Sequence, residues 1–203
     1  MKILLLSFYN LGKQPKIISE IYNKINSDLV EIDFVDFSLE SRRVDLEKYD
    51  AIGIYAPMHT ATVLATEYLS NQNLPDKIFT FGLYGDILSD IDSRIHFIES
   101  IDSDQLDKYL HLMANDNFSF KETVPDRSIL PNIKEYARLV EGGNNLLTGS
   151  VDTTYGCRHL CTHCPVPIQF NGRFRTFSEE KIIQDISLLE QELKIIHNKY
   201  QDK

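Results

Sequence analysis

The sequence predicts an α/β protein built on a doubly wound parallel sheet. Short apolar runs alternate with segments of helical periodicity from residue 1 to about residue 112. The apolar runs are largely continuous, which is typical of strands that are buried on both faces. Turn-forming residues separate the segments, as between Gly12 and Pro15. Together these features favour helices packed on both faces of one sheet.

The elements are expected in an alternating order. The predicted strands cover residues 2–8, 29–35, 51–55 and 78–83, with a short fifth at 95–98. The predicted helices contain the periodic isoleucines of 17–25, then residues 60–70 and 105–113. Residues 1–113 are therefore predicted to form one Rossmann-like domain.

The second half of the chain has a different pattern. A polar segment with Pro125 and Pro131 predicts a linker over 114–145, and a new strand is expected over 146–154. Ser178 is expected to cap a helix whose first turn is acidic. That helix carries an apolar stripe that is expected to face a core, at Ile182, Ile186, Leu189, Leu193 and Ile196. Residues 146–203 are thus expected to form a second unit.

The charge balance limits the classes of partner. The chain has 30 acidic and 21 basic residues and a formal net charge of -9, which argues against a nucleic-acid partner. No run approaches the roughly 18 apolar residues of a membrane span. The apolar run at residues 3–6 is too short for a signal peptide. We therefore expect a cytoplasmic protein that binds neither nucleic acid nor membrane.

The cysteines are the residues that most clearly indicate a chemical function. Cys157, Cys161 and Cys164 are the 3 cysteines of the chain and are spaced C-x3-C-x2-C. An odd, clustered set points to metal or redox chemistry and away from a disulfide framework. Three thiolates hold three irons of a cubane cluster and leave the fourth iron open for a small molecule. Gly156 directly before Cys157 fits a sharp bend at the start of the loop.

Other interpretations of these residues remain open. A structural zinc ion would need a fourth ligand, which His159 or His163 would supply. Free or catalytic thiols are a further alternative. His59, at a strand-to-helix turn, is either a pocket residue or a solvated or capping histidine.

The spacing C-x3-C-x2-C resembles the signature of the radical S-adenosylmethionine superfamily. The resemblance implies that Cys157, Cys161 and Cys164 bind a 4Fe–4S cluster whose open iron chelates S-adenosylmethionine. It also implies reductive cleavage to a deoxyadenosyl radical, with electrons from a reductant such as a flavodoxin or ferredoxin. His163 occupies the position before the third cysteine, which implies a contact with the adenine of that cofactor. The substrate, a small molecule or a peptide, stays undefined.

The likeness extends beyond the cysteines. Residues 57–61, 124–128, 136–139 and 171–175 resemble the CUAEP/CCAEP-tail subfamily. This implies that 1–113 is a cobalamin-binding-like domain and that 146–203 is a partial radical S-adenosylmethionine (β/α) barrel, truncated after its first unit.

Two expectations about function follow from this resemblance. Cobalamin itself is not favoured, because the loop after the first strand lacks the histidine of Asp-x-His-x-x-Gly. The full-length parent is expected to be a radical enzyme, and the alternative for this chain is a truncated, non-catalytic iron–sulfur or zinc module.

Overall fold

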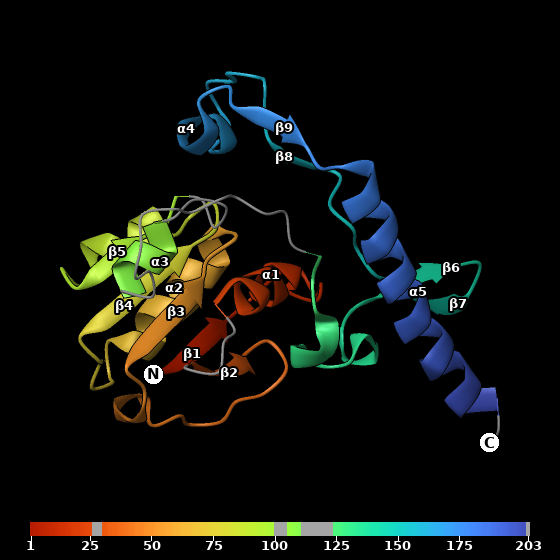
Figure 1. The fold of residues 1–203 in the computed structure, drawn as a ribbon, viewed down its shortest axis with the longest axis horizontal. Helices are drawn as coiled ribbons and strands as arrows, with labels where there is room; N and C mark the ends of the chain where they lie inside the picture. The colour runs from red at the N-terminus through yellow and green to blue at the C-terminus, as the bar shows by residue number, and fades with distance from the viewer. Residues whose placement is uncertain (26–29, 100–104, 111–123, 202–203) are drawn as a thin grey trace.

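The computed structural model describes residues 1–25, 30–99, 105–110 and 124–201 (Figure 1). Its centre is a five-stranded, all-parallel sheet in the order β2-β1-β3-β4-β5. The strands are β1 Lys2–Ser7, β2 Glu31–Asp36, β3 Ala51–Tyr55, β4 Lys77–Phe81 and β5 Ile95–Phe97. This order is that of a doubly wound fold, so the predicted α/β class with a parallel sheet is confirmed.

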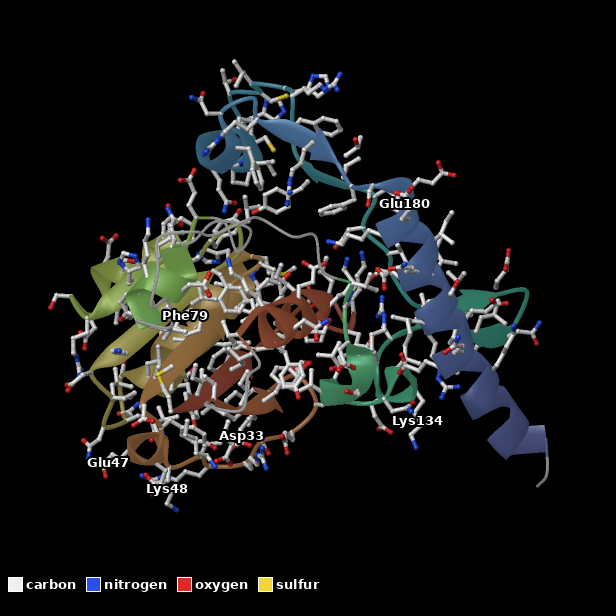
Figure 2. All side chains as sticks on the ribbon, viewed as in Figure 1. Asp33, Glu47, Lys48, Phe79, Lys134 and Glu180 are labelled. Atoms are coloured by element: carbon white, nitrogen blue, oxygen red, sulfur yellow. The ribbon has the colours of Figure 1, made fainter. Side chains whose placement is uncertain are left out.

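Helices cover both faces of the sheet because its strands are apolar on both sides. On β1, Ile3 and Leu5 belong to one core cluster, whereas Leu4 and Leu6 belong to the other. Helices α1 Lys16–Ile25 and α3 Gln105–Leu110 add side chains to the first cluster, which also holds Phe79 (Figure 2). Helix α2 His59–Leu69 packs on the opposite face. Short 3-10 turns, η1 Leu46–Lys48 and η2 Asp86–Asp90, join the strands.

Most predicted boundaries in this half agree within two residues. Strand β3 has the predicted bounds, and β5 ends one residue earlier than expected. The helix predicted over 105–113 is α3, which runs to Leu110, and residues 111–113 lie outside the described residues.

The second half contains more elements than the sequence pattern indicated. Turns η3 Arg127–Ile129 and η4 Ile133–Glu135 lead to an antiparallel hairpin, β6 Arg138–Glu141 and β7 Asn144–Leu147. A two-stranded ribbon follows, β8 Thr154–Gly156 and β9 Phe174–Thr176, with α4 Val166–Phe170 between its strands. The chain then enters the long helix α5 Glu179–Gln201.

The strand predicted over 146–154 is wrong. Leu146 and Leu147 belong to β7 and pair back with β6 across the turn at Gly142 and Gly143. A glycine pair with positive φ values closes such a tight hairpin, so the apolar residues after it join a local partner. Strand β8 begins only at Thr154, and α4 and β9 were not predicted.

The segment over 131–137, predicted as part of a linker, packs against the sheet. The Ala137 amide donates to the Gly12 carbonyl at 2.8 Å, and the buried Tyr136 hydroxyl donates to Asp36 at 2.8 Å. Gln14 Nε2 donates to the Pro131 carbonyl at 2.9 Å. These bonds hold the segment over the loop that follows β1.

Helix α5 begins as predicted but presents a different face. The Lys181 amide donates to Ser178 Oγ at 3.3 Å, which confirms Ser178 as the cap. The apolar stripe is buried only in part: Ile186 is 49% exposed, Ile182, Leu189 and Leu193 are partly buried, and the side chain of Ile196 lies outside the described residues. Lys181 and Asp185 are more deeply buried than the stripe. Ion pairs, described below, dock this helix, so charged residues occupy its inner side. Among the described residues, no helix is long and apolar enough to cross a membrane.

Candidate metal centre and adjoining cleft

The three cysteines lie in the loop that leaves the β8–β9 ribbon. Strand β8 ends at Gly156, which pairs with Phe174 on β9. In Figure 1 the ribbon and α4 stand above the end of the sheet, and in Figure 2 Glu180 marks where α5 begins beside them. The ribbon therefore brings both ends of the loop together.

Gly156 is required at the start of this loop. Its φ is +88°, and a Cβ there would lie 2.2 Å from the Arg173 carbonyl oxygen. The Cys157 amide donates to the same oxygen at 3.0 Å. Only a residue without a side chain permits this approach, so the bend that the sequence predicted is present.

The thiols share one loop but are not assembled around a common point. Cys157 and Cys164 are half-buried and Cys161 is exposed, and all 3 are free of disulfides. The Cys164 amide approaches the Cys161 carbonyl at 3.4 Å, so a turn links the second and third cysteines. In the described part of the chain, no group of three or more His, Cys, Asp or Glu side chains is placed to hold a metal ion.

The donor set nevertheless fits an iron–sulfur cluster. Three thiols on a short loop, framed by a ribbon, match the number and type of ligands that leave one iron of a cubane open. Metal sites commonly form as the ligands fold around the metal, which releases the thiol protons. Zinc remains an alternative, because His159 and His163 are exposed on the same loop. Cys157, Cys161 and Cys164 remain predicted ligands, and His163 remains a predicted cofactor contact.

Three arginines surround the loop. The Arg158 guanidinium lies 4.6 Å from the centre of the Phe174 ring. Arg173 pairs with Glu99, which follows β5, and its Nε donates to the Phe170 carbonyl at 3.1 Å. The Arg175 guanidinium lies 5.3 Å from the Tyr155 ring centre. Arg173 therefore ties the loop to the sheet. His59, which the sequence left open, is exposed at the start of α2.

A cleft separates the ribbon from the carboxyl ends of the central strands. We call it the strand-end cleft; it has a volume of about 370 Å³. Its sheet side includes Asn10 after β1, Pro57 after β3 and Gly82 after β4. Its ribbon side includes Tyr155, next to Gly156, and Gln169 of α4. Ligands of doubly wound folds bind at this edge of the sheet, where the strand order reverses between β1 and β3.

The tyrosines of the cleft lie in a negative environment. Burial is the main cause that raises the pKa of Tyr55 above its usual range, and Asp152 and Glu20 raise that pKa further. Burial, followed by Glu20, also raises the pKa of Tyr155. Both hydroxyls therefore stay protonated and remain hydrogen-bond donors and acceptors at neutral pH.

A set of charged side chains, buried except for the exposed Asp152, connects the two halves of the chain. We call it the α1–α5 ion cluster, and its members are Lys16, Glu20, Arg127, Asp152, Lys181 and Asp185. Arg127 Nη2 lies 2.9 Å from Asp185 Oδ1, and Lys16 Nζ lies 2.8 Å from Asp152 Oδ2. Lys181 pairs with Glu20 at 3.4 Å. Asp185, Lys16 and Arg127 are all nearly fully buried, so water screens these interactions weakly.

Sequence reasoning missed this cluster. Its members come from α1, η3, the segment before β8, and α5, and these positions are far apart along the chain. The one hint in the sequence was that Asp185 lies on the side of α5 next to the apolar stripe. A charged residue on a helix is normally predicted to face solvent, so this position did not indicate a buried ion pair.

No family model matches the sequence, and no curated protein matches it significantly. Support for a function therefore comes from the residues, their spacing and their geometry.

Proposed function

We propose that this chain binds a 4Fe–4S cluster through Cys157, Cys161 and Cys164 and belongs to a radical S-adenosylmethionine protein. The observation that carries the proposal is the placement of three thiols, free of disulfides and spaced C-x3-C-x2-C, in one loop that begins after Gly156 at the end of β8. When bound, the cluster supplies an open iron that chelates S-adenosylmethionine and an electron that cleaves it.

The frame of the loop supports this proposal. The backbone bond from Cys157 to Arg173 closes one end, and the pair of Arg173 with Glu99 ties the other end to the sheet. Between these points the three thiols form no disulfide, and Cys161 is exposed. A loop whose two ends are held in place, and whose cysteines between them can still move, suits binding in which the ligands close around a cluster.

Other residues have defined roles in the proposal. His163, exposed beside Cys164, contacts the adenine of S-adenosylmethionine. Arg158, stacked on Phe174, keeps a positive charge near the loop. A flavodoxin or ferredoxin supplies the electron. The antiparallel ribbon β8–β9 is not itself a unit of a parallel (β/α) barrel, and the assignment of residues 146–203 to the start of such a barrel stays a proposal.

The test is anaerobic reconstitution with iron and sulfide. We expect broad visible absorption and, after reduction, a paramagnetic resonance signal that shifts when S-adenosylmethionine is added. Cys157→Ala, Cys161→Ala and Cys164→Ala should each abolish the full cluster. His159→Ala is the matched control within the loop and should retain it.

The zinc alternative gives a different result. A colourless protein that retains one zinc ion, and that loses the ion in His159→Ala or His163→Ala, would show a Cys₃His site and overturn the iron–sulfur proposal. If a cluster forms but its signal does not change when S-adenosylmethionine is added, the result would contradict the radical S-adenosylmethionine proposal and support the alternative of a non-catalytic iron–sulfur module.

A further inference from the structure

The strand-end cleft has the dimensions of a small-molecule site. Its volume of about 370 Å³ lies near the lower end of the roughly 300–1,000 Å³ typical of ligand pockets. It lies against the loops that follow β1, β3 and β4, and the ribbon forms its other wall. Of the residues that line it, the proposed cluster site uses Glu99, whose pair with Arg173 anchors the cysteine loop, and Gly156, after which that loop begins.

The cleft does not fit a corrinoid. The segment over 131–137 lies over the loop after β1, through the bond of Ala137 to Gly12 and that of Gln14 to Pro131. A Cβ on Gly12 would lie 2.7 Å from that of Ala137, so the two segments are in close contact. A corrin ring with its nucleotide tail is much larger than the remaining space, which therefore suits a small ligand.

Among the charged side chains of the cleft, carboxylates outnumber ammonium groups. Gln169 Oε1 is buried and has no hydrogen-bond partner among the described residues. The carboxylates of Glu20, Glu99 and Asp152 line the cleft, against the ammonium groups of Lys13 and Lys16.

Lys16 already compensates Glu20 and Asp152, so Glu99 is the carboxylate of the cleft for which a ligand would compete. Lys16 Nζ lies within ion-pair distance of Glu20, Asp152 and Asp185, at 3.3, 2.8 and 3.6 Å, so its charge is already balanced. Lys13 is exposed at the rim, after β1. The buried Gln169 Oε1 has no hydrogen-bond partner among the described residues, which costs free energy, and a ligand that donates a hydrogen bond to it would remove that cost.

The walls of the cleft are aromatic. They are formed by Tyr55, Phe81, Tyr155, Phe170 and Phe177. Two of these rings already bind cations of the chain. Arg175 lies 5.3 Å from the ring centre of Tyr155 and 5.1 Å from that of Phe177, and Lys181 lies 3.9 Å from that of Phe177. Aromatic faces beside carboxylates attract organic cations.

We propose that the strand-end cleft binds a small organic cation, a primary amine on an aromatic body, whose ammonium group pairs with Glu99 and donates to Gln169. The inference goes beyond the proposed function and does not require the cluster.

In the structure, the guanidinium of Arg173 pairs with Glu99 and donates to the Gln169 carbonyl at 3.2 Å. The Glu99 carboxylate therefore already attracts a cationic group, and the ammonium group of the ligand would compete with the Arg173 guanidinium for this carboxylate.

The test is calorimetric titration of the full 203-residue chain, without iron, with tyramine. The matched probe is 3-(4-hydroxyphenyl)propionate, which keeps the phenol ring but carries a carboxylate. We expect tyramine to bind with a dissociation constant of about 1 mM or lower, and the acid to bind at least tenfold more weakly. Absence of binding by tyramine, or equal binding of the two probes, overturns the proposal.

Matched variants locate the site. Glu99→Gln and Gln169→Leu should each weaken tyramine binding at least tenfold, whereas Glu47→Gln, on the remote turn η1, should not change it. Arg173→Gln removes the same ion pair as Glu99→Gln but leaves the carboxylate, so it should bind tyramine equally or more tightly. If Arg173→Gln loses binding as Glu99→Gln does, the pair only closes the cleft and the proposal is wrong. Thermal unfolding of each variant confirms that it is folded.

Discussion

At the scale of single residues, the backbone sets the position of the cysteine loop. Gly156 allows the chain to turn with φ +88° against the Arg173 carbonyl, and that carbonyl receives the Cys157 amide. The first proposed ligand is thus placed by a hydrogen bond to the opposite strand. A change at Gly156 should therefore affect cluster binding without removing a thiol.

Gly156→Ala should destabilise the ribbon by about 2–4 kcal/mol, because it combines an unfavourable φ with a clash against Arg173. Gly142→Ala is the matched control, since φ there is +56° and nothing lies within 4 Å of the added Cβ. We expect the control to lose about 1 kcal/mol. Urea unfolding of both variants measures the difference. Equal losses would show that the contact with Arg173 carries no free energy.

Tyr136 and Tyr49 provide a comparison between buried and exposed hydrogen bonds. Tyr136 donates to the buried carboxylate of Asp36, and Tyr49 donates to the partly exposed carboxylate of Asp33, both at 2.8 Å. Tyr136→Phe should lower the free energy of unfolding by about 1.5–3 kcal/mol, and Tyr49→Phe by less than about 1 kcal/mol. Denaturant titration at neutral pH measures both losses. The reverse order would contradict this role for burial.

Tyr136 also predicts a response to alkaline pH. Burial, and then the nearby Asp36, raise the pKa of Tyr136 above its usual value of 10.0. Above pH 10 the unfolded chain releases this proton while the folded chain retains it, so the stability due to Tyr136 is complete below pH 10 and is lost as the pH rises. Wild type should therefore lose more stability than Tyr136→Phe between about pH 9 and about pH 11. Parallel denaturation curves at those pH values provide the test.

At the scale of elements, charge joins α1 to α5. Asp185 lies between Arg127 and Lys16, and all three side chains are nearly fully buried. A balanced buried cluster adds little stability over an apolar contact, but removal of one member leaves a charge without compensation. The cluster therefore specifies where α5, and the ribbon before it, are placed.

Asp185→Asn should cost about 3 kcal/mol or more, because it leaves Arg127 and Lys16 with less compensating charge in a buried site. Glu190→Gln on the same helix breaks the exposed pair with Lys194 and should cost less than about 0.5 kcal/mol. Thermal unfolding of the two variants measures the contrast. A small effect of Asp185→Asn would show that water reaches the cluster.

At the scale of the whole molecule, the apolar core is separate from the cysteine unit, by which we mean the β8–β9 ribbon, its cysteine loop and α5. Both core clusters draw their described residues from the first part of the chain, up to Leu130, and none comes from β8, β9 or α5. The cysteine unit is attached through ion pairs and hydrogen bonds. Regions with few buried apolar contacts open at lower free energy than the core.

Amide hydrogen exchange should reflect this division. We expect amides of β1, β3 and β4 to exchange last, and those of β8 and β9 to exchange much earlier. Asp185→Asn should accelerate exchange in β8, β9 and α5 and leave the central sheet almost unchanged. Uniform acceleration across the chain would show that the two parts unfold as one unit.

The sequence by itself determined the parallel sheet and the cysteine motif. Continuous apolar runs such as residues 2–8 specify strands buried on both faces, and Ser178 specifies a helix start, because these signals are local. The spacing of the three cysteines is equally local, and the ligand assignment built on it stays a prediction.

Tertiary structure decided how the second half is arranged. Leu146 and Leu147 joined a hairpin because Gly142 and Gly143 turn the chain back before the predicted strand could extend. The inner face of α5 is charged, because Lys16 and Arg127 lie opposite it and compensate Asp185. The strand-end cleft likewise exists only where the ribbon meets the sheet. Lys16 and Asp185 are more than a hundred positions apart, and Arg127 and Asp185 more than fifty, so periodicity along the chain carries no information about these pairs.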